Sequence, residues 1–398
     1  MLLRKNPLIP WISQHHVLSA FLFIILFSLF KLLLAPAYFS TDFEVHRNWL
    51  AVTHSLPLDE WYVDSTSPWT LDYPPLFAFF EKFLSFFANA VDPKIVSISN
   101  LNYASQSCVL FQRISVILSD FFFYFSLWFF LKTICKNDLS LFLSFAITSS
   151  FPALLFIDHV HFQYNGFLMS WFLWSFTFLI KGKLELSAFY FAVSIGFKHI
   201  FIFFALPFFL ILLVRTLYSH QSKLIILVNL FKVFTAGALP LLLVSRLFPF
   251  QRGLIHSYPA PNFWVMYTSF DLLLSRLREN SSTLLTSGLT FTSTSVLPNP
   301  PSWLCLLLSL LPCLVHVCRI KRRTLQKSTV ISFVLISGLC FFFFGYHVHE
   351  KALLMITIPM IPLFFSSRSH LLSNCALIMT SITCVAVIPL FSDFKRLC

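Results

Sequence analysis

Long runs of apolar residues separated by short polar segments dominate this chain. A membrane-spanning helix needs roughly 20 mostly apolar residues, and the runs near this length predict about eleven spans. A β-barrel would alternate polar and apolar residues over short segments, and the sequence shows no such alternation. We therefore expect an all-α polytopic membrane protein, with residues 1–398 forming a single membrane-embedded domain. The predicted spans are 17–35, 107–131, 139–157, 163–180, 184–197, 200–216, 224–245, 301–318, 328–346, 351–366 and 371–390.

Basic residues orient these spans through the positive-inside rule. With Arg4 and Lys5 in the cytosol, the short cytosolic segments hold 14 of the 28 Lys and Arg but only two acids. The opposite face receives 13 of the 16 Asp and Glu, although acids were not used to choose the orientation. Two long loops, 36–106 and 246–300, are expected on that non-cytosolic face. No small-x-small cleavage site follows the first span, 17–35, which favours an uncleaved signal anchor.

A few ionisable residues fall within apolar runs. Asp120 is the one acid inside a predicted span, and Lys31, Arg113 and Lys232 lie within or near such runs. Charged groups at this depth usually pair with one another or extend toward the membrane surface. We expect these basic residues to pair with Asp120 or to reach the surface.

Composition excludes several classes of function. The chain is 57% hydrophobic and 11% charged with a net charge of +12, but its basic residues flank apolar runs, which indicates topology control rather than nucleic-acid binding. It has eight Gly and no Gly-rich phosphate loop, so no nucleotide cofactor is expected. None of the nine Cys forms a C-x-x-C pair, so neither a disulfide framework nor a cysteine metal site is predicted.

The first long loop contains the densest patch of charge. "STDFEVHRNW", residues 40–49, carries Asp42, Glu44 and Arg47 directly after an apolar run, and "WTLDYPP" adds Asp72. One of these carboxylates is a candidate general base, with the others orienting a substrate. The alternative is a solvated loop whose acids cap helices.

Two further polar clusters occur at predicted helix ends on the same face. "DHVHFQYNG" and "YHVHEK" each contain a His-x-His pair, which raises the alternative of zinc. That spacing does not place both rings on one helix face, so we favour binding of a phosphate by His and Lys, with an ordinary helix end as the remaining interpretation. The candidates are Asp158, His161, Gln163, Asn165, His347, His349, Glu350 and Lys351.

A third cluster, "SRLFPFQRGLIHSYPAPNFW", places Arg252 in the second long loop. Arg252 is a candidate clamp for phosphate or sugar, although an arginine at a membrane surface needs no ligand. All of these clusters face one compartment. A transporter would more often bury its ionisable residues near the middle of the membrane. The distribution therefore favours an active site at a membrane surface.

Six motifs in chain order resemble one known family. "STDFEVHRNW", "WTLDYPP", "DHVHFQYNGF", "FKHI", "RLFPFQRGL" and "FGYHVHEKA" are similar to the dolichyl-phosphate-glucose-dependent α-1,3-glucosyltransferases of the endoplasmic reticulum. "TDFEVHRNWLA" and "RGLIHSYPAPNFW" resemble the branch that adds the second glucose. The branch that adds the first glucose typically has Ala-Gln in place of Val45-His46.

The resemblance implies a multi-spanning glycosyltransferase of the lipid-phosphate-sugar (C) class, in the endoplasmic reticulum membrane with a luminal site. Its donor would be dolichyl phosphate glucose and its acceptor Glc1Man9GlcNAc2 on dolichyl pyrophosphate, both held in membrane lipid, with no cofactor or metal. The alternatives are a first-glucose transferase acting on Man9GlcNAc2-PP-dolichol and a non-catalytic lipid or sugar transporter. Family members usually continue through further spans, so a shortened C-terminus is expected.

The resemblance also suggests roles for residues. Asp42 would be the base, with Glu44, Arg47 and Asp72 orienting the acceptor or supporting the loop. The donor phosphate would contact His347, His349, Lys351 and Arg252. The other candidates near the reaction are Asp158, His161, Gln163, Asn165 and Glu350.

Overall fold

The structure is a computed structural model that describes residues 8–217, 260–277, 296–319, 326–366, 370–388 and 390. Within these ranges every regular element is a helix, which confirms the all-α class. The predicted span 224–245, most of the loop 246–300, and the residues Lys232 and Arg252 lie outside the described residues.

The first half of the chain supplies nine α-helices. They are α1 (Leu8–Gln14), α2 (His16–Leu33), α3 (Thr41–Ser55), α4 (Pro75–Val91), α5 (Gln106–Ile134), α6 (Asp138–Ser149), α7 (Pro152–His159), α8 (Asn165–Lys181) and α9 (Leu184–Phe197). The described later elements are α10 (Ala205–Leu217), α12 (Phe263–Leu277), α13 (Ser302–Arg319), α14 (Lys327–Phe344), α15 (Leu354–Ser366) and α16 (His370–Ala386). Short 3₁₀ helices are η2 (Pro93–Val96), η3 (His199–Phe204) and η6 (Glu350–Leu353).

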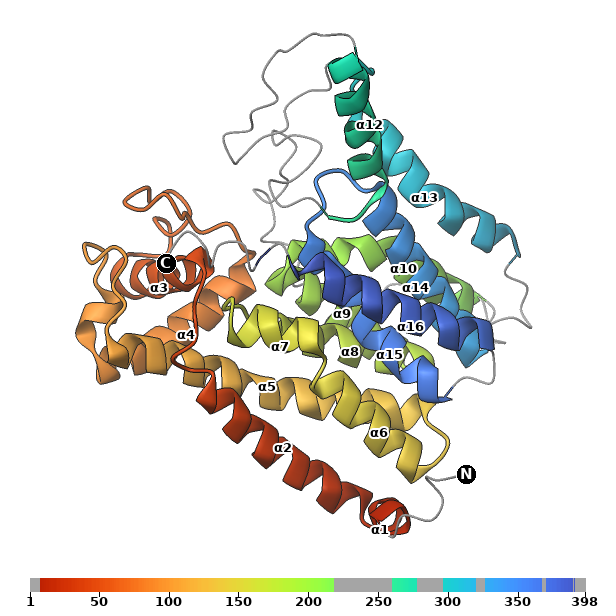
Figure 1. The fold of residues 1–398 in the computed structure, drawn as a ribbon, viewed down its shortest axis with the longest axis horizontal. Coiled ribbons are helices and arrows are strands. Elements are labelled where there is room, and N and C mark those ends of the chain that lie inside the picture. The colour runs from red at the N-terminus through yellow and green to blue at the C-terminus, as the bar shows by residue number, and fades with distance from the viewer. Residues whose placement is uncertain are drawn as a thin grey trace.

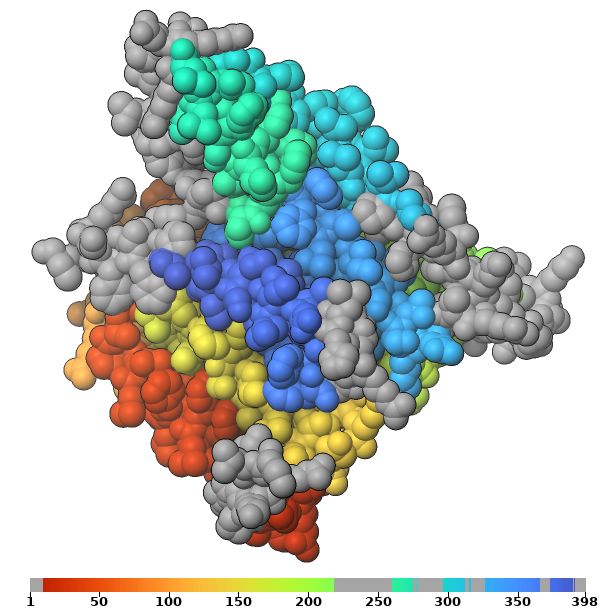
Figure 2. Space-filling view, turned by 45° about the vertical axis from the view of Figure 1, so that its right-hand side comes forward, coloured from red at the N-terminus to blue at the C-terminus, as the bar shows by residue number. Residues whose placement is uncertain are grey.

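The longer helices form a bundle with α8 near its centre. Figure 1 shows α2, α5 and α6 along one side, α3 and α4 grouped at one end, and α12 and α13 projecting from the body. α8 packs between α5 and α9. Figure 2 shows α2 on the outer surface, where large apolar side chains such as Phe21, Leu26 and Leu33 are exposed. This exposure fits a helix that faces lipid.

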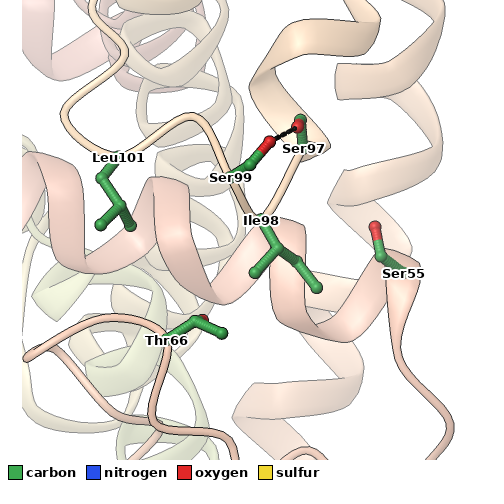
Figure 3. Close-up of a pocket in the computed structure, with 6 residues that line it drawn as sticks. All are labelled: Ser55, Thr66, Ser97, Ile98, Ser99 and Leu101. Carbon is green, nitrogen blue, oxygen red and sulfur yellow. Dashed lines mark hydrogen bonds between the residues drawn. The ribbon is translucent and has the colours of Figure 1, made fainter.

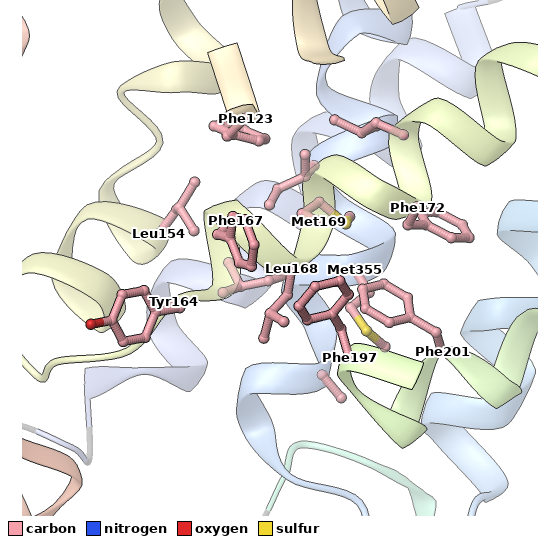
Figure 4. Packing of buried hydrophobic residues seen from close by; sticks show 14 of the residues in the cluster. Phe123, Leu154, Tyr164, Phe167, Leu168, Met169, Phe172, Phe197, Phe201 and Met355 are labelled. Carbon is pink, nitrogen blue, oxygen red and sulfur yellow. The ribbon is translucent and has the colours of Figure 1, made fainter. Parts of the chain in front are cut away.

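Phenylalanine and other apolar side chains of α8 make the centre of the core. Phe167, Leu168, Met169 and Phe172 are buried there, and Phe172 stacks on Phe201 with ring centroids 5.4 Å apart. Figure 4 shows these side chains packed with residues from other segments of the chain, including Phe123, Leu154, Phe197 and Met355. The start of α8, which carries several candidate site residues, is therefore anchored in the buried core.

Within the described residues, fewer helices than the eleven predicted spans have the length and composition of a membrane span. Four have the length and composition: His16–Leu33, Gln106–Ile134, His199–Leu217 and Lys327–Phe344, and the pair α6 and α7, bent by 41°, makes a fifth if counted as one. The described residues therefore do not confirm about eleven spans. Several predicted spans form shorter helices: α9 has 14 residues, or about 21 Å. Pro152 begins α7 and breaks the run predicted as 139–157.

The loop predicted over 36–106 contains two well-formed helices. At the start of α3, the Ser40 side chain accepts a hydrogen bond from the Asp42 backbone N–H, and Asp42 and Glu44 lie in the first turn, where the helix dipole favours acids. Pro75 occupies the first turn of α4, where a missing N–H has no cost. These local signals explain why a polar, aromatic segment between spans is helical.

Of the two described basic residues in apolar runs, Lys31 and Arg113, one pairs with Asp120 as expected. Lys31 of α2 lies 2.5 Å from the Asp120 carboxylate of α5 and donates to the Tyr124 hydroxyl at 2.7 Å. His159 at the end of α7 contacts the same carboxylate oxygen at 2.8 Å. Arg113 instead donates to backbone carbonyls, among them that of His159 at 2.7 Å. All of these side chains are buried, so the pairing of Lys31 with Asp120 is confirmed.

Lys31→Met should destabilise the protein by about 2–3 kcal/mol, because it leaves the buried Asp120 carboxylate with an incomplete set of partners. The loss of stability is measured by thermal unfolding in detergent, monitored with a fluorescent dye that does not react with thiols. Lys31→Met combined with Asp120→Asn should lose less stability than Lys31→Met alone. A double variant that is no more stable than the single variant would contradict the pairing argument.

Candidate active site

Asp42 lies at the beginning of α3, where the chain turns from the end of α2 into the helix. Ser40 holds this turn from both sides. Its hydroxyl accepts from the Asp42 N–H at 3.1 Å and donates to the His161 carbonyl at 2.5 Å. The start of α3 is thereby tied to a segment 121 residues later in the chain.

Three side chains from distant segments converge on one oxygen of Asp42. Gln163 Nε2 donates to Oδ2 at 2.5 Å, and Lys351 Nζ at 3.0 Å. His161 Nε2 lies 3.2 Å from the same oxygen and 3.1 Å from Lys351 Nζ. Among the described residues, no side chain binds Oδ1. The sequence predicted each of these residues as a candidate, and the structure brings the four together.

The charge state of Asp42 follows from these contacts. Burial by itself would raise the pKa of the carboxyl, but the Lys351 charge and the His161 contact outweigh it and hold the pKa well below its usual value. The side chain is still 23% exposed. Asp42 is therefore an ionised carboxylate with Oδ2 held by donors, whereas within the described part of the chain no side chain binds Oδ1, as a general base requires.

The segment from Asp158 to Gly166 carries two of the Asp42 partners. Both Asp158 oxygens accept backbone N–H groups, from Asn165 at 3.0 Å and from Gly166 at 2.7 Å. Buried Phe162 has a φ of 80°, a left-handed conformation that costs such a residue of order 1–3 kcal/mol. This turn lies between His161 and Gln163, both of which reach Asp42.

Gly166 occurs where a side chain would not fit. A Cβ there would lie 2.9 Å from the Asp120 carboxylate and 3.5 Å from that of Asp158. Glycine therefore allows the start of α8 to approach both acids closely.

Lys198, which the sequence did not select as a site residue, extends the polar network. It follows α9 in the "FKHI" motif, and its ammonium donates to Asn165 Oδ1 at 3.0 Å. The same ammonium lies 5.2 Å from the centre of the Tyr73 ring, within the range of a cation–π contact. Burial and the nearby charge of Lys351 lower the pKa of Lys198 to about 8.

The other predicted residues of the first loop lie apart from the Asp42 cluster or at its edge. Arg47 and Glu44 form a buried bidentate pair at 2.7 and 2.8 Å, and Arg47 also donates to the Ile95 carbonyl at 3.1 Å. This pair ties α3 to the segment after α4. Asp72 is exposed. The pKa of Tyr73 is raised, first by burial of the Tyr73 hydroxyl and second by the negative charge of Asp72. A role for any of them in orienting an acceptor stays a prediction.

The predicted cluster in "YHVHEK" precedes α15. The rings of His347 and His349 lie edge to face with centroids 5.8 Å apart, and His347 has a φ of 53°. Glu350 is buried, which raises the pKa of its carboxyl, and Lys351 follows it in η6. Of this cluster, Lys351 is the residue seen to contact Asp42. No three His, Cys, Asp or Glu side chains converge as metal ligands in the part of the chain that the structure describes.

A separate open pocket of about 500 Å³ lies beside the Glu44–Arg47 pair. Figure 3 shows its lining, which is mostly hydroxyl-bearing: Ser55, Thr66, Ser97, Ile98, Ser99 and Leu101. The carbonyl of Ser97 accepts from Arg47 at 3.2 Å, and the Ser55 hydroxyl donates to the Val96 carbonyl at 2.9 Å. None of the residues predicted from the sequence lines this pocket, and its short, scattered serines give no motif that would reveal it.

Comparison with known proteins identifies the relatives of this chain. The model of the ALG6, ALG8 glycosyltransferase family matches residues 27–397. The chain belongs to this family. It is 42% identical over 364 residues to the probable dolichyl pyrophosphate Glc1Man9GlcNAc2 α-1,3-glucosyltransferase of Drosophila melanogaster, covering 85% of this chain and 70% of that protein.

Other members of the ALG6, ALG8 family are similar over the same extent. The dolichyl pyrophosphate Glc1Man9GlcNAc2 α-1,3-glucosyltransferase of Arabidopsis thaliana is 40% identical over 388 residues, covering 91% of this chain and 75% of that protein. The protein of that name from Bos taurus is 39% identical over 380 residues, covering 84% and 70%. Sequence motifs thus predicted the family of this chain correctly.

Lys351→Met should raise the pKa of Asp42, because burial, which favours the protonated carboxyl, then meets less opposition. Carbodiimides react with protonated carboxyls, so labelling at pH 5, read by peptide mass spectrometry, should report the change. We expect labelling of Asp42 to increase about tenfold for each unit by which its pKa rises.

Exposed Asp59 on the same molecule provides the internal reference for the labelling rate. Lys94→Met, which removes an exposed lysine from η2, is the matched control and should leave the ratio of Asp42 to Asp59 labelling unchanged. An unchanged ratio in Lys351→Met as well would show that Lys351 does not set the charge of Asp42.

Proposed function

We propose that this chain transfers glucose from dolichyl phosphate β-D-glucose to Glc1Man9GlcNAc2-PP-dolichol. The product would carry the second α-1,3-linked glucose of the lipid-linked oligosaccharide used for protein N-glycosylation. The names of the similar proteins, dolichyl pyrophosphate Glc1Man9GlcNAc2 α-1,3-glucosyltransferases, support this acceptor. The observation that carries the proposal is the Asp42 carboxylate, which is held through Oδ2 while no side chain of the described residues binds Oδ1.

The chemistry proposed for Asp42 is that of a general base. A β-linked donor and an α-linked product require inversion, which a single displacement achieves without a covalent glycosyl-enzyme. The acceptor oxygen attacks the anomeric carbon, its proton passes to Asp42, and the bond from that carbon to the phosphate oxygen breaks. Dolichyl phosphate leaves on the opposite face with the electron pair.

The leaving phosphate gains charge in this step and needs cations near it. Among the described residues, we assign this role to Lys351, because its ammonium lies beside Asp42 and its side chain is 16% exposed, within reach of a bound substrate. His347 and His349 lie on the same segment, and Arg252, outside the described residues, stays a predicted partner. One cluster would thus serve both the base and the leaving group.

The location proposed for the reaction is the luminal surface of the endoplasmic reticulum membrane, with the chain crossing that membrane several times. The start of α3 directly follows α2, a helix long and apolar enough to span, so Asp42 lies at the end of that span. Both substrates have lipid tails that stay in the bilayer. Their reacting groups can therefore meet only at its surface.

Asp42→Asn should lower the rate of glucosyl transfer by about 10²–10⁴-fold, because the amide cannot accept the acceptor proton. The measurement uses membranes containing the chain, synthetic dolichyl phosphate glucose, and either Glc1Man9GlcNAc2 or Man9GlcNAc2 on dolichyl pyrophosphate. Transfer to the Glc1Man9 acceptor, but not to the Man9 acceptor, is the expected result for the parent chain.

The matched control is Asp59→Asn, an identical change at an exposed aspartate in the same loop, which should leave the rate unchanged. Full activity in Asp42→Asn would exclude Asp42 as the base. Transfer to the Man9 acceptor alone would instead assign the chain to the first glucose.

A further inference from the structure

An unbroken chain of hydrogen bonds joins Lys198 to Asp42. Lys198 Nζ donates to Asn165 Oδ1 at 3.0 Å, Asn165 Nδ2 donates to Gln163 Oε1 at 2.8 Å, and Gln163 Nε2 donates to Asp42 Oδ2 at 2.5 Å. Gln163 is buried. These hydrogen bonds lead from a cation to an anion through two side-chain amides.

Lys198 and Asp42, at the two ends of this series of hydrogen bonds, permit only one orientation of the amides. The Lys198 ammonium can only donate, and the Asp42 carboxylate can only accept. Asn165 must therefore turn its oxygen toward Lys198, which directs its NH₂ group to Gln163. Gln163 must then present its oxygen to Asn165 and its NH₂ group to Asp42.

Asp158 imposes the same orientation on Asn165 from another side. Asn165 Nδ2 donates its second hydrogen to Asp158 Oδ1 at 2.8 Å, and that oxygen also accepts the Asn165 backbone N–H. A reversed Asn165 would set its oxygen against this carboxylate. A reversed Gln163 would set oxygen against oxygen at Asp42 and NH₂ against NH₂ at Asn165, which buried groups do not tolerate.

We infer that Lys198 is a positioning residue, which acts through Asn165 and Gln163 to hold an amide N–H on the Asp42 carboxylate. It does not touch the reacting atoms. Its effect is to keep Oδ2 engaged, so that the carboxylate is oriented with Oδ1 toward the acceptor. The effect on turnover rests on the proposed function, whereas the effect on Asp42 itself does not.

A through-space effect of charge is the competing explanation. The described charged groups that act on Lys198 are Lys351, Asp158, Asp42 and Asp72. Removing the Lys198 charge therefore also changes the electrostatic potential at Asp42 directly. A double-mutant cycle separates the two effects, because a relay needs Gln163 and a through-space effect does not. Lys198→Met is therefore combined with Gln163→Met, which keeps the size of the side chain and removes the amide.

The readout is carbodiimide labelling of Asp42 relative to Asp59 at pH 5 in the full chain. With Gln163 present, Lys198→Met should raise the ratio about fivefold or more, whereas in the Gln163→Met background it should change the ratio by about twofold or less. Lys198→Arg, which also can only donate, should keep the ratio near that of the parent chain. Lys198→Glu, which presents an acceptor to Asn165, should raise it furthest.

Equal changes in the two backgrounds would overturn the inference in favour of a through-space charge. In the transfer assay, Lys198→Met should lower kcat about tenfold and leave KM for dolichyl phosphate glucose unchanged. A loss confined to that KM would overturn the inference by making Lys198 a ligand of the donor. If the parent chain transfers no glucose, the proposed function fails, and the labelling cycle still decides the relay.

Discussion

The structure around the candidate site depends on one requirement, that a single carboxylate be kept ionised and oriented where the chain leaves the membrane. Asp42 meets it through donors that are 121 and 309 residues away in the sequence. A carboxylate that is largely withdrawn from water is unstable without such partners. The cap at Ser40, the turn at Phe162 and the placement of η6 each bring one of the partners into contact.

The polar residues buried among the spanning helices also help to hold the partners of Asp42 in place. Asp120 binds Lys31 and His159, and Arg113 binds the carbonyls of His159 and Val160. These contacts fix the beginning of the segment that carries His161 and Gln163. Ionisable groups in a membrane usually mark a pathway or a site. Here they are explained by the need to hold a strained turn in one position.

The sequence predicted the family, the all-α class and most residues of the Asp42 cluster, because motifs and apolar runs are local signals. It could not predict that Asp42 contacts Lys351, 309 residues later in the chain, since sequence distance carries no information about such contacts. It missed Lys198, whose role depends on a partner 33 residues earlier. The described residues do not confirm about eleven spans, in part because an apolar run does not reveal a break such as the one at Pro152, which divides the predicted span 139–157 into α6 and α7.

The low pKa of Asp42 is compatible with the chemistry proposed for it. An acceptor hydroxyl becomes strongly acidic as its oxygen bonds to an electron-poor anomeric carbon, so a weak base suffices to remove the proton late in the displacement. Such a base must supply a fixed position and a constant negative charge. Both lower the activation barrier of the transfer, because the site does not have to reorganise during the reaction. The donors on Oδ2 reduce the basicity of Asp42 but provide both of these properties. An arrangement that maximised basicity, with Asp42 buried and unpaired, would leave the carboxyl protonated and without function.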